Sequence, residues 1–208
     1  YIPSANANYF SQNVCWSWGY RYLGGIKFIS NILSDLNWNS LLDIGCGDGR
    51  FLYEINNTYD NKKLHGIDYS HKAIKFAKAF NDSINFSCLN ILDEDEDKLN
   101  SLGKFDIVTC IETIEHIPIN DFSKFIKKIL FFLKPNGKLI ITAPHSNSKK
   151  NIKYFQHFNS KKLKDILTEQ NLTYEFIFFD KRSKFISLCS ILLGFNSKNF
   201  IIINKKIL

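Results

Sequence analysis

The chain has 208 residues, 45% of them apolar and 23% charged, which favours a single soluble globular domain and excludes a disordered or fibrous protein. Its formal net charge of +7 comes from scattered lysines, so a solvated basic face is favoured over a nucleic-acid partner, which stays an alternative. Five widely spaced cysteines without a Cys-x-x-Cys pair argue against a disulfide framework and a zinc site. Together with the lack of an apolar stretch long enough to span a bilayer, this cysteine pattern favours a cytoplasmic location.

The N-terminal region, residues 1–36, is expected to be an extension of the domain core. Residues 1–25 are aromatic-rich and contain Gly24-Gly25, and a helical apolar pattern follows from Ile26 to Leu36. The aromatic rings could form a lid over a ligand or pack on the sheet edge. We expect one domain over residues 1–208, with its core at residues 37–208.

Within this core, short apolar runs alternate with helical segments. The clearest helix is expected at residues 122–133, where one apolar stripe recurs at helical spacing and Pro135-Asn136-Gly137 ends the pattern. Ser70 is placed to cap an earlier helix and Ser160 a later one. Strands are expected at residues 40–44, 63–67, 84–87, 105–110, 138–142, 174–180 and 200–204.

This alternation predicts an α/β, Rossmann-like, doubly wound fold with a mainly parallel sheet covered by helices on both faces. In such sheets ligands bind beyond the carboxyl ends of the strands, so functional residues are expected on the loops that follow strands.

The strongest motif is a glycine loop directly after the first strand. Residues 41–49 read Leu-Leu-Asp-Ile-Gly-Cys-Gly-Asp-Gly, and a helix is expected from about Arg50. Glycine permits positive φ and lets a ligand approach the backbone closely. The start of the helix adds unpaired N–H groups and a partial positive field.

Asp68 ends the second strand, where a carboxylate can accept the hydroxyls of an adenosine ribose, and the ring of Tyr69 could lie against adenine. A nicotinamide dinucleotide is the competing ligand. Its fingerprint places the third glycine one residue later, and Asp43 and Asp48 add negative charge where its diphosphate would lie. S-adenosylmethionine (SAM) carries a sulfonium and an amino group instead, so the pattern favours SAM.

Four motifs resemble those of class I SAM-dependent methyltransferases and occur in the same order. They are residues 43–49, 66–68, 105–108 and 133–139, and the resemblance extends from about Ser40 to the C-terminus. It implies a seven-stranded sheet whose last strand is antiparallel. It also implies that Gly45, Gly47 and Gly49 surround the methionine part of SAM, that Asp68 binds the ribose, and that residues 88–91 hold adenine. The remaining predicted cofactor-binding residues are Asp43, Cys46, Tyr69, Asn90, Ile91 and Ile111.

The groups that act on the acceptor are expected after the fourth strand, where Glu112, Glu115 and His116 follow one another closely. In one interpretation His116 is a general base or positions the acceptor. The Glu-His pair resembles that of the small-molecule methyltransferases that include the ubiquinone-biosynthesis O-methyltransferases. In another, these three residues and His157 bind Mg²⁺ or Mn²⁺, as in small-RNA 2′-O-methyltransferases. In the third, Glu115 and His116 only cap and pack. His145, after the fifth strand, is a further candidate for contact with the acceptor.

The preferred interpretation is a methyltransferase, with no metal ligands assigned, that transfers the methyl group of SAM to a small molecule, at oxygen rather than nitrogen, releasing S-adenosylhomocysteine (SAH). The alternatives are an RNA 2′-O-methyltransferase and a SAM-fold binding module without catalysis. The sequence does not identify the acceptor or the oligomeric state.

Overall fold

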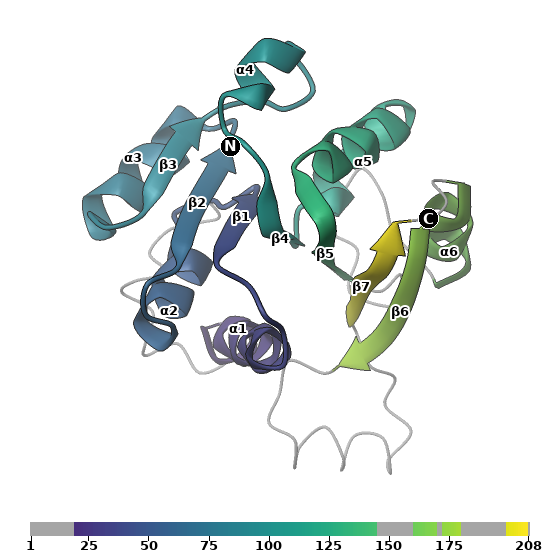
Figure 1. Ribbon diagram of the computed structural model, residues 1–208, viewed down its shortest axis with the longest axis horizontal. Helices are drawn as coiled ribbons and strands as arrows, with labels where there is room; N and C mark the ends of the chain where they lie inside the picture. The colour runs from purple at the N-terminus through teal and green to yellow at the C-terminus, as the bar shows by residue number, and fades with distance from the viewer. Residues whose placement is uncertain (1–18, 145–159, 170–171, 180–198, 208) are drawn as a thin grey trace.

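A seven-stranded sheet forms the centre of the protein (Figure 1), with the strand order β3-β2-β1-β4-β5-β7-β6. The computed structural model describes residues 19–144, 160–169, 172–179 and 199–207. The strands are β1 (Ser40–Ile44), β2 (Lys63–Asp68), β3 (Asn85–Cys88), β4 (Phe105–Ile111), β5 (Leu133–Pro144), β6 (Leu172–Phe179) and β7 (Asn199–Ile207). The helices are α1 (Gly19–Ser34), α2 (Arg50–Thr58), α3 (His71–Phe80), α4 (Glu96–Asn100), α5 (Phe122–Phe131) and α6 (Ser160–Glu169).

The five strands β1 to β5 run parallel, which confirms the predicted Rossmann-like α/β class. β7 pairs antiparallel with both β5 and β6. The chain starts at the centre of the sheet with β1, moves outward to β3, and returns through β4 on the other side of β1. This reversal places the ends of β1, β2 and β4 side by side, which is where α/β sheets bind ligands.

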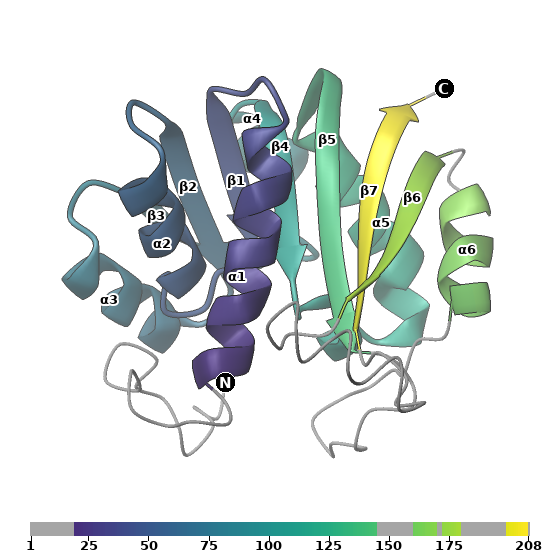
Figure 2. The same cartoon turned by 90° about the horizontal axis from the view of Figure 1, so that it is seen from below.

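Helices cover both faces of the sheet, as Figure 2 shows, and the side chains of each strand alternate between two cores. On one face α1, α2 and α3 pack over Leu41, Ile107 and Ile140. On the other face α5 packs over the next residue of each of these strands, and Leu99 of α4 and Leu167 of α6 join that core. Both faces are therefore buried, and no helix among the described residues is long and apolar enough to cross a membrane.

Helix α1 begins earlier than the apolar pattern predicted. It starts at Gly19 and runs through Gly24 and Gly25. Its apolar residues Ile26, Ile29 and Leu33 are buried against the sheet. This packing outweighs the helix-propensity cost of the two glycines, about 1 kcal/mol each. Residues 1–18, which include most of the aromatic residues considered for a lid, lie outside the described residues.

Two other boundaries differ from the prediction. Helix α5 ends at Phe131 because the carbonyl of Phe132 accepts a hydrogen bond from the Phe105 amide of β4, so Leu133 already pairs in the sheet. Pro135-Asn136-Gly137 therefore lies within an irregular part of β5, where Asn136 has φ +63°.

The acidic run at residues 93–97 contributes the first residues of α4. Asp95 caps this helix by accepting a hydrogen bond from the Lys98 amide at 2.9 Å. Glu94 pairs with Lys98 across one turn. A cap and an i, i+4 ion pair are enough to make this short turn helical. The predicted cap at Ser70 is confirmed, since its hydroxyl accepts from the Ala73 amide.

Asp106 joins the starts of three neighbouring strands. Its carboxylate accepts hydrogen bonds from the amide and hydroxyl of Ser40 at 2.9 and 2.8 Å, from the Asn39 amide at 3.1 Å and from the Lys134 ammonium at 3.0 Å. Partial burial raises the pKa of Asp106, but these hydrogen bonds outweigh that effect and lower the pKa from 3.8 to about 2.

Because the folded-state pKa of Asp106 is depressed, its stabilising effect is present above pH 4 and is lost as the pH falls toward 2. We expect Asp106→Asn to lower the free energy of unfolding by about 2 kcal/mol at pH 7, with a smaller difference from wild type at pH 3. Urea unfolding at both pH values measures this, with the exposed Asp60→Asn as the control. An equal loss at pH 7 and pH 3 would contradict the assignment.

Candidate functional site

The glycine loop leaves the carboxyl end of β1 in a series of left-handed conformations. Gly45, Gly47 and Gly49 have φ values of 76°, 56° and 78°. The amides of Gly45 and Cys46 both donate to the Ile67 carbonyl of β2, at 2.8 and 3.0 Å. The loop is thus attached to the neighbouring strand before α2 begins at Arg50. This explains why a run of glycines follows a buried strand here.

The three glycines meet different surroundings. A Cβ atom on Gly45 would come within 2.5 Å of Cγ2 of Thr113, and one on Gly49 within 2.8 Å of the Phe86 ring. A Cβ atom on Gly47 would meet no atom of the described residues within 4 Å. Gly45 and Gly49 are therefore required by packing inside the protein, whereas Gly47 presents a bare backbone to open space, where a ligand can approach.

Asp68 lies beside this bare glycine at the end of β2. Its carboxylate accepts hydrogen bonds from the Gly47 amide at 3.0 Å and from the Ser70 amide at 2.8 Å. The side chain is only 7% exposed, and burial raises its pKa even though both hydrogen bonds oppose the rise. A carboxylate can accept about four hydrogen bonds, so two amides leave room for the hydroxyls of a ligand.

Two further carboxylates, Asp43 in β1 and Asp48 in the loop itself, lie close to the site. Burial raises the pKa of Asp43 to about 7, against the hydrogen bond that it accepts from the Thr109 hydroxyl at 2.7 Å. Burial likewise raises the pKa of Asp48 to about 6. The nearby Arg50 guanidinium pairs with Glu54 at 2.8 Å. A cation bound near the loop would stabilise the charged carboxylates, whereas a diphosphate would be repelled by them.

Cys46 contributes bulk rather than a reactive thiol. It is buried, and burial together with the nearby Asp43 and Asp68 raises its pKa well above the ordinary value. A thiol in such surroundings stays protonated and inert. Its sulfur packs against Gly66 of β2, where a Cβ atom would come within 2.8 Å of it.

The residues predicted to hold adenine lie on the loops after β2 and β3. The Tyr69 side chain is 61% exposed, so its ring is available to a flat ligand. Asn90 is partly buried, and its amide group bonds within its own turn, to the Asp93 carboxylate and the Leu92 amide. Ile91 is buried in the core below α5. Its side chain is thus part of the core, and only its backbone remains for ligand contact.

The loop after β4 brings Glu112 and Thr113 to the same edge of the sheet. Thr113 packs under Gly45, as described above, and its hydroxyl donates to the Ile111 carbonyl at 3.1 Å. Glu112 has φ +52°, a conformation that is rare for glutamate. Ile111, which precedes it, is partly buried against the core that contains α1. Glu112 is therefore the chain neighbour of Thr113, the residue that lies beside Gly45.

Glu115 and His116, although adjacent in the chain, occupy different environments. Glu115 is 1% exposed, within a 3₁₀ turn (Ile114–His116), whereas the His116 side chain is exposed. Among the described residues no three His, Cys, Asp or Glu side chains gather in a way that could hold a metal ion. His145 and His157 lie outside the described residues.

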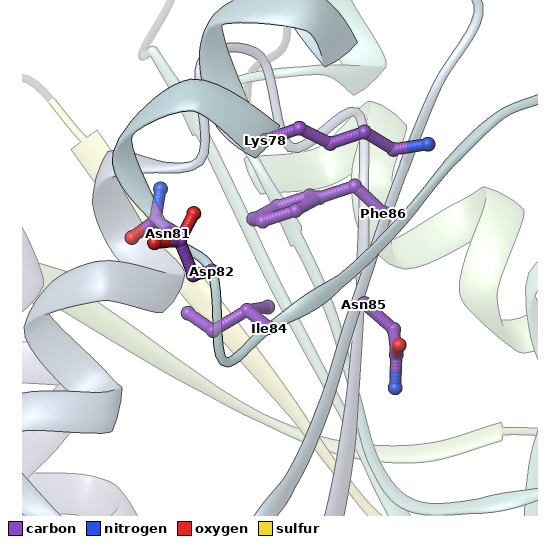
Figure 3. Close-up of a pocket in the computed structure, with 6 residues that line it drawn as sticks. All are labelled: Lys78, Asn81, Asp82, Ile84, Asn85 and Phe86. Atoms are coloured by element: carbon purple, nitrogen blue, oxygen red, sulfur yellow. The ribbon is translucent and has the colours of Figure 1, made fainter.

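A cavity of about 320 Å³ lies away from this site, around the turn that joins α3 to β3 (Figure 3). The cavity adjoins the start of β3, whereas the glycine loop follows the end of β1. The two therefore lie toward opposite ends of the parallel strands. Its lining residues are Lys78, Asn81, Asp82, Ile84, Asn85 and Phe86.

Sequence reasoning missed the threonines that support the site. Thr109 donates to Asp43, Thr113 fills the space beside Gly45, and the Thr142 hydroxyl contacts Glu112. Threonine is common in strands, so nothing in the pattern of residues distinguishes these three from ordinary strand positions. Only the parallel pairing of β1, β4 and β5 brings each one to its partner.

We expect Gly45→Ala to lower the free energy of unfolding by about 3 kcal/mol, because a clash with Thr113 adds to the cost of a positive φ. Gly47→Ala should cost only about 1 kcal/mol, since its Cβ atom enters open space. Urea unfolding of the ligand-free proteins compares the two variants. Equal losses would show that Gly47 is not the open position of the loop.

Comparison with known proteins identifies the family of this chain. A family model described as "Methyltransferase domain" matches residues 38–180. The ubiquinone biosynthesis O-methyltransferase of Coxiella burnetii (strain RSA 493) is 31% identical over 128 residues, which are 60% of this chain and 51% of that protein. The phosphoethanolamine N-methyltransferase of Plasmodium falciparum is 34% identical over 134 residues, 62% of this chain and 48% of that protein. The chain spans about half the length of these curated relatives.

Solved structures share the fold at low sequence identity. The plantazolicin methyltransferase BpumL in complex with SAH has a TM-score of 0.68 at 19% identity, covering 96% of this chain and 88% of that chain. The methyltransferase domain of a bacterial Hen1 has a TM-score of 0.70 at 17% identity, covering 89% and 98%. Since the family model matches more than half of its length, the chain belongs to the methyltransferase-domain family and has the fold of the class I SAM-dependent methyltransferases.

Proposed function

We propose that this protein binds SAM across the ends of β1 and β2 and transfers its methyl group to a hydroxyl oxygen of a small molecule. The observation that carries the proposal is the bare backbone of Gly47 beside the buried carboxylate of Asp68. A Cβ atom at Gly47 would occupy the space in which a ligand can lie against the loop.

The residues of the site fit SAM. The ribose hydroxyls would donate to Asp68, and the adenine ring would lie near Tyr69 and the turn at Asn90. The methionine part would cross the glycine loop, above the acidic groups Asp43 and Asp48, where its positive charge is favoured. The same negative charge disfavours the diphosphate of a dinucleotide. Ile91 and Ile111 would border the cofactor through their backbone or their partly buried surface.

SAM supplies a methyl group already activated by its sulfonium, so the protein has to align the acceptor and accept its proton. Alignment of two reactants can supply several kcal/mol of the barrier. In this proposal the exposed His116 takes the proton of the acceptor hydroxyl, and Glu112 orients that hydroxyl beside the methyl group. Glu115, buried under the same turn, packs the loop from below. His145 would approach the acceptor from the end of β5.

The choice of a small molecule rests on the relatives. Those named as ubiquinone biosynthesis O-methyltransferases and as a phosphoethanolamine N-methyltransferase act, by name, on small molecules. The Hen1 domain shares the fold alone at 17% identity. The metal site considered for an RNA 2′-O-methyltransferase needs Glu112, Glu115 and His116 to converge, and the burial of Glu115 with exposure of His116 does not favour that arrangement.

Asp68→Asn should weaken binding of SAH at least tenfold, because one of the two acceptor oxygens becomes an NH2 donor, which cannot accept from a ribose hydroxyl. Titration calorimetry with SAH and with its 2′-deoxyribose analogue measures the contact directly. We expect the wild type to prefer SAH by about tenfold or more and Asp68→Asn to show little preference. If the preference persists in the variant, Asp68 does not bind the ribose. This cycle separates a lost ribose contact from a general loosening of the loop.

His116→Ala should lower kcat for methyl transfer by about 10²-fold or more, the usual contribution of a general base, while leaving the affinity for SAH unchanged. The assay follows radiolabelled methyl transfer from SAM to a panel of catechol, phenol and sugar hydroxyls. The exposed His71, at the start of α3, provides the matched control His71→Ala. Unchanged kcat in His116→Ala would assign His116 to packing. SAH binding without turnover of any acceptor would instead support a binding module.

A further inference from the structure

Glu112 holds a backbone conformation that its residue type does not favour. Three non-glycine residues in the described part of the chain have positive φ: Asn61 at 57°, Glu112 at 52° and Asn136 at 63°. Asparagine tolerates this region because its short side chain bonds locally, whereas glutamate gains no such compensation. Strained residues of this kind persist where surrounding contacts hold them, and they cluster at functional sites.

Thr142 of the neighbouring strand β5 makes several of the contacts that hold Glu112. The Glu112 amide donates to the Thr142 hydroxyl at 3.0 Å and to the Thr142 carbonyl at 3.3 Å. The Thr142 hydroxyl in turn donates to the Glu112 carboxylate at 3.0 Å. One hydroxyl therefore binds both the backbone and the side chain of the same glutamate. Thr142 is itself 1% exposed and pairs with Ile111 in the parallel sheet, so its hydroxyl has a fixed position.

A purely structural role would not explain the glutamate. Glycine or asparagine would adopt φ +52° at lower cost, and either would keep the amide hydrogen bonds to Thr142. What glutamate adds is a carboxylate. This carboxylate follows the end of β4, accepts a hydrogen bond from the buried Thr142 hydroxyl of β5, and belongs to the residue before Thr113, which packs under Gly45. A carboxylate can accept about four hydrogen bonds, so the bond from the Thr142 hydroxyl does not by itself fill the acceptor capacity of Glu112.

We propose that Thr142 is a positioning residue for methyl transfer, which holds the Glu112 carboxylate in place to accept a hydrogen bond from a hydroxyl on the acceptor. This inference rests on the proposed function and deepens it: it selects acceptors that present a proton-donating group to Glu112. Thr142 does not contact the acceptor itself. It acts through the orientation of Glu112.

The first arm of the test measures methyl transfer. Thr142→Val keeps the shape of the side chain but removes the hydroxyl, and Thr142→Ser restores it. With a catechol acceptor we expect Thr142→Val to lose at least tenfold in kcat while its KM for SAM stays within twofold, and Thr142→Ser to recover most of kcat. Glu112→Gln, which keeps the size but not the charge, should lose at least as much as Thr142→Val. Wild-type kcat in Thr142→Val would overturn the positioning role.

The second arm needs no acceptor and measures thermal unfolding in a double-mutant cycle. Thr142→Val should lower Tm by about 3 °C in the wild-type background. In the Glu112→Gly background it should lower Tm by at most half as much, because glycine takes φ +52° without being held. Glu112→Gly alone should not lower Tm, although it should abolish turnover. Equal Tm losses in both backgrounds would show that Thr142 does not stabilise the conformation of Glu112.

The two arms also separate this inference from the proposed function. A wild-type protein that methylates no acceptor contradicts the proposed function, and the thermal cycle still decides whether Thr142 holds Glu112. An active wild type with equal kcat in Thr142→Val and Thr142→Ser contradicts the positioning role alone.

Discussion

The site depends on one constraint, the attachment of the glycine loop to the end of β2. The loop must turn sharply after β1, and the Ile67 carbonyl and the Asp68 carboxylate together bind the amides of Gly45, Cys46 and Gly47. These bonds fix the loop in left-handed conformations that only glycine adopts without strain. They also direct the open side of Gly47 away from the protein and place Asp68 beside it. The rest of the site is arranged around this loop.

The negative charge of the site follows from the position of the same loop. Asp43 lies one residue before the end of β1, Asp68 ends β2, and Asp48 lies on the loop itself, so three buried carboxylates lie near the loop. Burial raises the pKa of each of them. A cationic ligand bound beside these carboxylates would stabilise their charged forms. This is a physical reason for the loop to select a sulfonium compound over a phosphate.

Local signals in the sequence predicted β1 and the cap of α3 accurately. β1 falls at Ser40–Ile44 as expected, and Ser70 caps α3, because an apolar run and a cap are local features. The start of α1 was misplaced because Gly24 and Gly25 suggest a turn, whereas the packing of Ile26 and Ile29 on the sheet keeps them helical. The end of α5 was misplaced because the bond from the Phe105 amide to Phe132 joins distant parts of the chain.

The residues of the site also differ in how well the sequence predicts them. The glycines and Asp68 form a recognisable motif, so the cofactor side could be predicted from the sequence, whereas Glu115 and His116 are neighbours whose opposite environments only the fold determines. The threonines that orient the carboxylates carry no signal of their own. Thr142 reaches Glu112 only because β5 runs parallel to β4 in one particular register.

The most direct measurement for the central claim is a crystal structure of the protein with SAH. We predict SAH across the ends of β1 and β2, with its ribose hydroxyls on Asp68, its homocysteine chain against Gly47, and its sulfur directed toward Glu112 and His116. SAH bound elsewhere, for example in the cavity beside α3, or a sulfur directed away from the loop after β4, would contradict it.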